Sequence, residues 1–190
     1  MKKVAADSRA LHKGFRNVLG IALLYEGAIF LWALGADDIT LPAILPIPGQ
    51  QYYYYELIFL LPLFLITWLL ASSIAYVLSR AFGGRGSFDS LLGGFGLSMS
   101  VSAYFTLIPD YIQGILWTTG IVPFATYLDI SGKGILLIIT WTYMAAYTLS
   151  HIAFYSLAIQ HTQGLSGFRS VFVGLLSFTG SFCIWITFVR

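Results

Sequence analysis

Charged residues are scarce in this chain of 190 residues, where lysine, arginine, aspartate and glutamate together make up 9% of the sequence. A soluble domain carries about 25% charged residues, so this composition excludes an ordinary soluble domain. The formal net charge of +2 is too small to indicate a nucleic-acid partner. Cysteine is almost absent as well. The single Cys183 excludes an intramolecular disulfide, and its place inside an apolar run predicts a buried, inert thiol.

Catalytic and cofactor motifs are also missing. The sequence has no G-x-S-x-G elbow, no H-E-x-x-H pair and no P-loop. Its histidines, His12, His151 and His161, are too scattered to ligate a metal from one helix. We therefore expect neither an enzyme nor a bound cofactor or metal.

Hydrophobic residues make up 58% of the chain. They form long apolar runs, and at ~1.5 Å per residue a helix of about 20 residues crosses a hydrocarbon core of about 30 Å. The runs predict an all-α, polytopic integral membrane protein, with one transmembrane domain of five helices over 18–190 in contact with the lipid bilayer. The predicted spans are residues 18–36, 57–79, 91–109, 135–159 and 171–189.

Two further segments are not predicted to span the membrane. Residues 1–17 are basic, and their apolar residues recur on one face of a helix. This amphipathic segment could lie along an anionic membrane surface or only orient the first span. Residues 111–128 contain Gly114, Gly120 and Pro123. Their length is marginal and their middle is broken, which predicts an interfacial or re-entrant segment.

The distribution of basic residues predicts the orientation. With five spans and the N-terminus inside, eight of the ten lysines and arginines fall on inner segments. The positive-inside rule then predicts a cytoplasmic N-terminus and an outer C-terminus. Five acids fall at the outer level, where their carboxylates could gather Ca²⁺ or Mg²⁺ or could be solvated charges beside the spans. This predicted outer acidic cluster consists of Asp37, Asp38, Glu56, Asp110 and Asp129.

Two glycine-containing turns lie on the predicted inner side. The first, 83–88, joins the second and third spans; its three glycines allow φ > 0, and Ser87 can cap the helix that Phe88 begins. The second, 160–169, joins the last two spans. Together they predict a paired cytoplasmic surface whose arginines could bind lipid phosphates or an acidic partner, or only orient the spans. Its residues are Arg80, Gly83, Gly84, Arg85, Gly86, Ser87, Phe88, His161, Gly164 and Arg169.

Two ionisable side chains fall inside predicted spans, where a charged group costs ~2.5 to 3.5 kcal/mol on insertion scales. Glu26 and His151 each lie eight residues from the inner end of their span, which is about 12 Å along a helix. They could therefore meet if the first and fourth spans are neighbours. Such a pair could be a proton relay or half of a cation site, or it could be a structural hydrogen bond between helices.

Short motifs in both turns point to one family. Residues 83–92 read GGRGSFDSLL and are followed by Gly96-Leu97-Ser98. This segment resembles the G-G-x-G-S-F motif, and the glycine-tyrosine-serine-like helix after it, of the Yip family of Ypt/Rab-interacting multi-span proteins. The stretch HTQGLS at 161–166 is similar to that family's histidine-glycine-leucine-serine turn. The resemblance runs from about Leu57 to the C-terminus, although Val101-Ser102 stand where the family often has proline.

This resemblance implies five spans, a cytoplasmic N-terminus and a role as a membrane scaffold or adaptor. The long N-terminal region of eukaryotic members is missing, and the compact size resembles prokaryotic members, so a multi-pass protein of a prokaryotic cell membrane is expected. We predict a non-enzymatic scaffold that acts through partner proteins or lipids at its cytoplasmic turns. The alternative is a small ion or solute transporter or channel that uses Glu26 and His151, for which a homo-oligomer would help to form a pore.

Overall fold

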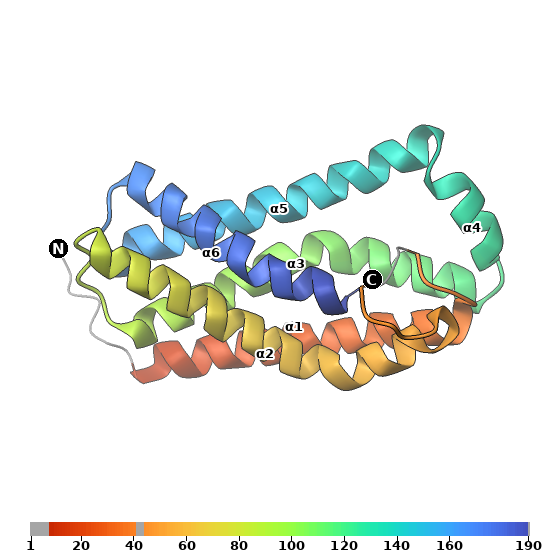
Figure 1. The fold of residues 1–190 in the computed structure, drawn as a ribbon, viewed down its shortest axis with the longest axis horizontal. Coiled ribbons are helices and arrows are strands. Elements are labelled where there is room, and N and C mark those ends of the chain that lie inside the picture. Colours follow the sequence, from red (N-terminus) through yellow and green to blue (C-terminus); the bar gives the residue numbers. More distant parts are fainter. Residues whose placement is uncertain (1–7, 41–43, 190) are drawn as a thin grey trace.

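The computed structural model describes residues 8–40 and 44–189, and this part of the chain folds into six helices without a strand (Figure 1). Helix α4 (Phe124–Ser131) is short, whereas the other five are long and apolar enough to cross a membrane. The prediction of an all-helical protein with five membrane spans is confirmed. The long helices are α1 (Ser8–Gly35), α2 (Gly49–Ala81), α3 (Phe88–Thr118), α5 (Gly134–Gln163) and α6 (Gly167–Phe188).

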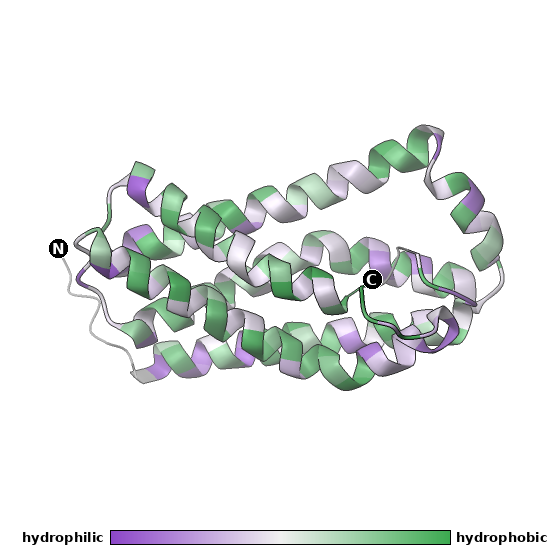
Figure 2. Cartoon of the chain, in the orientation of Figure 1, coloured by the Kyte–Doolittle hydropathy of each residue, from purple (hydrophilic) through white to green (hydrophobic). Residues whose placement is uncertain are grey.

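The long helices alternate in direction. Helices α1, α3 and α6 start at one end of the bundle, and α2 and α5 return to that end (Figure 1). Most of the strongly hydrophilic residues lie towards the two ends, and the middle of the bundle is largely apolar (Figure 2). This distribution fits a bundle that spans a bilayer, because lipid tails offer no partners to polar side chains.

The first span begins earlier than the apolar run alone predicts. Helix α1 starts at Ser8, so the basic residues of 8–17 belong to the same helix as the span. Residues 8–17 are therefore a basic flank continuous with the first span, while residues 1–7 lie outside the described chain. A helix does not stop where charge begins, because its backbone hydrogen bonds continue into water as well as in lipid.

The third span ends later than predicted. Pro109 removes one backbone donor from α3, yet the helix continues because the turns beyond it are held against α1. Trp32 Nε1 donates to Asp110 O at 2.8 Å, and Thr118 Oγ1 donates to Leu31 O at 2.9 Å.

A separate re-entrant segment over 111–128 is therefore not formed. Its first eight residues complete α3, a turn follows at 119–123, and α4 begins at Phe124. The glycine and proline that indicated a break in the segment, Gly120 and Pro123, lie in that turn, where Gly120 has φ of +71°.

Helices α1 and α3 run in the same direction and approach so closely that glycine is required. A Cβ on Gly14 would lie 2.8 Å from Gly93 Cα, and a Cβ on Gly96 would lie 2.5 Å from Gly14 O. Further along the pair, the Tyr25 hydroxyl donates to Ala103 O at 3.0 Å. Close backbone approach and interhelical hydrogen bonds are the forces that associate helices in lipid, where no hydrophobic drive exists between them.

Helix α2 packs against α1, α3 and α6. Trp68 Nε1 of α2 donates to Leu92 O of α3 at 3.0 Å, and the Phe64 and Trp185 rings meet edge to face at 4.7 Å. The buried side chains of α6 follow helical spacing up to Ser181, which places Cys183 on the opposite face. Cys183 is exposed, so the prediction of a buried thiol is wrong.

Helix α5 has two unlike halves. Its second half packs on α3 and α6, whereas none of the side chains of 132–150 is buried. Towards its N-terminal end α5 diverges from α3, and α4 crosses between the two far ends (Figure 1).

Candidate functional site

The two glycine-containing turns meet at one end of the bundle. The backbone N–H of Arg85 donates to Gln163 O at 3.1 Å, and Gln163 Nε2 donates to Ser87 O at 3.2 Å. A Cβ on Gly86 would lie 1.8 Å from Thr162 O, so only glycine allows the turns to come this close. The turns therefore form one joined unit.

Local backbone geometry follows the sequence pattern of these turns. Gly83 and Gly164 have positive φ, +86° and +71°, a conformation that glycine adopts without steric cost. Ser87 caps α3 as predicted, since its Oγ accepts from the N–H of Ser90 at 3.2 Å. Phe88 packs its ring on Tyr76 at 5.3 Å and is half-buried, so it fastens the turn to α2.

Exposed basic side chains surround the joined turns, and we call this region the basic end. The Arg80 guanidinium donates to Gly84 O at 3.1 Å, and that of Arg169 donates to Phe82 O at 3.2 Å. These two bonds hold the arginines against the turns without neutralising them. The residues of the basic end are Arg80, Arg85, His161 and Arg169 of the turns, with Arg9, Lys13 and Arg16 of the first turns of α1, and all are exposed.

The structure does not bring Glu26 to His151. Helix α1 packs on α2 and α3, whereas α5 packs on α3 and α6, and no contact joins the two side chains in the described part of the chain. They also lie at different depths. Tyr25, next to Glu26, reaches Thr106 of α3, while His151 lies beside Met99, which is about 10 Å away along the same helix. The predicted equal depth is wrong because α1 is ten residues longer at its start than the predicted span.

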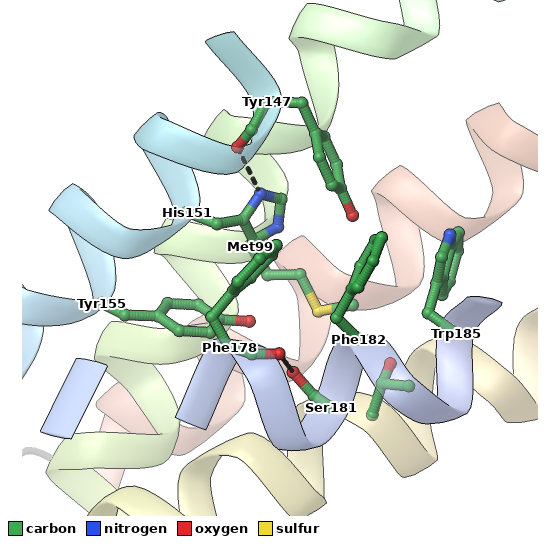
Figure 3. Close-up of a pocket in the computed structure, with 9 residues that line it drawn as sticks. Met99, Tyr147, His151, Tyr155, Phe178, Ser181, Phe182 and Trp185 are labelled. Atoms are coloured by element: carbon green, nitrogen blue, oxygen red, sulfur yellow. Dashed lines mark hydrogen bonds between the residues drawn. The ribbon is translucent and has the colours of Figure 1, made fainter. Parts of the chain in front are cut away.

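His151 instead belongs to an aromatic cluster. Its Nδ1–H donates to Tyr147 O of its own helix at 3.0 Å, and its ring lies 4.2 Å from the Tyr147 ring and 5.5 Å from the Phe178 ring. These rings line a cavity of about 20 Å³ (Figure 3), which has room for about one water molecule. The imidazole is buried, and its hydrogen bond stabilises the local helix.

The five outer acids do not converge. Asp37, Asp38 and Asp129 are exposed, Glu56 is fully buried in α2, and Asp110 lies within α3. No group of three or more acidic, histidine or cysteine side chains able to hold a metal occurs in the described residues. The prediction of an outer acidic cluster is therefore wrong: acids at one level along the membrane normal do not converge when they lie on different faces of different helices.

Asp110 is fixed to α1 through its backbone, since Asp110 O accepts from Trp32 Nε1 at 2.8 Å. Its carboxyl is close enough to interact electrostatically with four phenols contributed by three helices: Tyr25 of α1, Tyr127 of α4, and Tyr143 and Tyr147 of α5. Burial, followed by Tyr143 and the Asp110 carboxylate, raises the pKa of Tyr127 to about 12, so this phenol outside the spans stays protonated at neutral pH.

Part of this tyrosine group has a signal in the sequence that counting charged residues does not detect. Tyr143, Tyr147, His151 and Tyr155 follow one another at intervals of four, which places them on one face of α5. An aromatic stripe with polar tips in an apolar helix indicates a buried polar contact. Tyr25 and Tyr127 carry no such signal, because only the fold brings α1 and α4 to Asp110.

Comparison with known proteins gives no relative: no protein-family model, no curated protein and no solved structure matches the chain.

Proposed function

We propose that this protein is a non-enzymatic membrane scaffold whose basic end binds the phosphate groups of anionic lipids. The observation that carries the proposal is the joined pair of turns, where the Arg85–Gln163 and Gln163–Ser87 hydrogen bonds fix two loops from different parts of the chain into one exposed basic unit. Backbone carbonyls also hold the guanidinium groups of Arg80 and Arg169, and a guanidinium group held in place binds phosphate with little loss of conformational entropy.

The proposed orientation places the basic end in the cytoplasm. Six lysines and arginines of the described chain lie at this end, and Lys133 lies at the other end of α5. The positive-inside rule and the negative potential of the cytoplasmic leaflet both favour that orientation. A reporter enzyme that is active only outside the cytoplasm should then be active when it is fused after Ser131. A reporter that is active only in the cytoplasm should be active when it is fused after Gly83.

The resemblance to the Yip family supports a scaffold role. The two segments that carry the resemblance, 83–92 and 161–166, are those that meet at the basic end. We propose a compact, prokaryotic-type relative of that family that organises lipids or protein partners from this surface. A homo-oligomer stays a prediction, and the transporter based on Glu26 and His151 lacks the contact it required.

Short-chain lipids test the binding proposal. Purified protein in a nonionic detergent is titrated with dioctanoyl phosphatidylglycerol and, separately, with dioctanoyl phosphatidylcholine, with tryptophan fluorescence as the readout. A basic residue near an anionic surface contributes ~1 kcal/mol, which is roughly fivefold in affinity. We expect Arg85→Ala to weaken phosphatidylglycerol binding by about fivefold and Arg85→Ala with Arg169→Ala by about 25-fold.

Lys133→Ala is the matched control, because it removes the same charge at the opposite end. It should leave the affinity unchanged. Raising the salt from about 0.1 M to 1 M reduces the Debye length from about 10 Å to about 3 Å. This change should weaken phosphatidylglycerol binding to the wild type more than binding to the double variant. Equal affinity of the wild type for the two lipids would refute the proposal.

A further inference from the structure

We propose that the cavity beside His151 binds one hydroxyl group, which is supplied either by a water molecule or by the head of a membrane-soluble alcohol. The cavity is lined by residues of α2, α3, α5 and α6 and is distinct from the basic end (Figure 3). Its volume of about 20 Å³ is enough for one oxygen atom with its hydrogen atoms.

Three polar atoms of α5 at this cavity have no hydrogen bond in the described part of the chain. They are the hydroxyls of Tyr147 and Tyr155 and the Nε2 atom of His151. Both phenol hydroxyls point from α5 towards α6 (Figure 3). His151 and Tyr155 are only 3% and 2% exposed, and buried polar groups are nearly always hydrogen-bonded. A small ligand that pairs with these three atoms is therefore expected in the cavity.

The three atoms are held in place around the cavity. The His151 ring lies 4.2 Å from the Tyr147 ring and 5.6 Å from the Tyr155 ring. The other hydroxyls that line the cavity, those of Thr67 and Ser181, each donate to a carbonyl of their own helix, at 2.8 Å and 3.0 Å. The unpaired groups of α5 are therefore the ones available to a ligand.

The hydrogen-bonding pattern of the cavity selects a hydroxyl group. The Nδ1–H of His151 donates to Tyr147 O, so the neutral imidazole has a lone pair at Nε2 and requires a donor there. The phenol hydroxyls can both donate to the oxygen atom of the ligand. A hydroxyl group donates once and accepts twice, and it therefore satisfies all three atoms. A carbonyl oxygen would leave Nε2 unpaired, and an ammonium ion would find no carboxylate among the residues that line the cavity.

The cavity can be reached from the lipid. Tyr147, Phe182 and Trp185 line it and are only half-buried, and beyond Tyr147 the helix α5 diverges from the bundle (Figure 1). A long-chain alcohol can therefore place its hydroxyl in the cavity while its apolar tail stays in the lipid. A water molecule makes the same three hydrogen bonds without a tail.

Nuclear magnetic resonance of the full chain with ¹⁵N-labelled histidine tests for the ligand. The detergent is lauryldimethylamine oxide, which has no hydroxyl group of its own. The substitutions His12→Gln and His161→Gln, both at exposed positions, leave His151 as the single source of imidazole signals. We expect the chemical shift of Nε2 to be that of a hydrogen-bonded nitrogen, and we expect a cross-peak between the ring protons of His151 and water.

Variants without the phenol hydroxyls test the partners of the ligand. Tyr147→Phe combined with Tyr155→Phe removes two of the three partners and keeps both rings, including the stacking of Tyr155 on Phe95 at 4.1 Å. This double variant should lose the cross-peak and show the Nε2 shift of a free lone pair. Tyr155→Phe alone should weaken the cross-peak, which gives a second measurement if the double variant does not fold. Tyr143→Phe is the matched control, because it removes a hydroxyl from the same face of α5 outside the cavity, and it should leave both signals unchanged.

Octanol and octane distinguish the two sources of the hydroxyl. If a cross-peak to octanol replaces the cross-peak to water while octane has no effect, the ligand is a membrane-soluble alcohol. If neither compound changes the water cross-peak, the ligand is water. A free lone pair at Nε2 in the wild type, signals that persist in the double variant, or loss of the water cross-peak on addition of octane would overturn the proposal.

Discussion

Replacing Gly96 by alanine should separate α1 from α3. The new Cβ would lie 2.5 Å from Gly14 O and 2.6 Å from Gly14 Cα, where ordinary contacts begin near 3.4 Å. The neighbouring atoms belong to the backbone, so no side chain can rotate away and the helices must part by roughly 1 Å. A gap of 0.5 to 1 Å already loses about a quarter to a half of the dispersion energy of each contact along the pair.

Overpacking of this kind costs about 1 to 3 kcal/mol. For a chain of this length a loss of 1 kcal/mol lowers the melting temperature by roughly 2 to 4 °C, so a loss of 2 kcal/mol predicts about 4 to 8 °C. The assay is thermal unfolding in detergent, followed by the folded fraction in size-exclusion chromatography.

Gly20→Ala is the matched control for this change. Gly20 lies in the middle of α1, and a Cβ there meets nothing within 4 Å. Alanine favours a helix over glycine by up to about 1 kcal/mol, so Gly20→Ala should melt at or above the wild-type temperature. The reasoning about close backbone approach fails if Gly96→Ala is as stable as Gly20→Ala.

Three further substitutions test the contacts between helices and turns. Gly164→Ala should destabilise the protein by about 1 to 2 kcal/mol, because the residue has φ of +71°, and a thermal melt beside that of Gly20→Ala would show it. Gln163→Ala removes the donor to Ser87 O and should increase amide hydrogen exchange of residues 83–87 while leaving α5 protected; unchanged exchange in that turn would contradict the joined unit. Tyr25→Phe removes the hydroxyl that bonds Ala103 and Thr106 and should cost about 0.5 to 1.5 kcal/mol in thermal unfolding, so a melt equal to that of the wild type would show that this bond has no net value.

The number and class of the helices could be predicted from the apolar runs alone, because a bilayer demands about 20 apolar residues per helical span. The ends of the helices could not. The predicted first span begins after Arg16 and the predicted third span ends before Asp110, yet both residues lie within continuous helices. A charged side chain stops a hydrophobic run without stopping the backbone hydrogen bonds that define the helix.

The basic end and the surroundings of Asp110 differ in how far the sequence predicts them. The basic end depends on two turns whose glycines and arginines are visible in the sequence, and the positive-inside rule predicts both turns on one side. The surroundings of Asp110 depend on which helices are neighbours. Tyr143 and Tyr147 share a helical face, but the rings that α1 and α4 bring to the same carboxyl depend on helix packing, which the spacing of residues within one helix does not encode.

The contact between Gly14 and Gly96 has a consequence for the order in which the protein is made. Helix α2 is synthesised between the two helices that pack most tightly, and partners such as Tyr25 and Ala103 are separated by 78 positions. At 5 to 20 residues per second, a ribosome takes about 4 to 16 s to cover that distance. During this interval the glycine face of α1 has no partner in the membrane. Incorrect helix pairing, or binding by an insertase, should therefore occur mainly between the insertion of α1 and the insertion of α3.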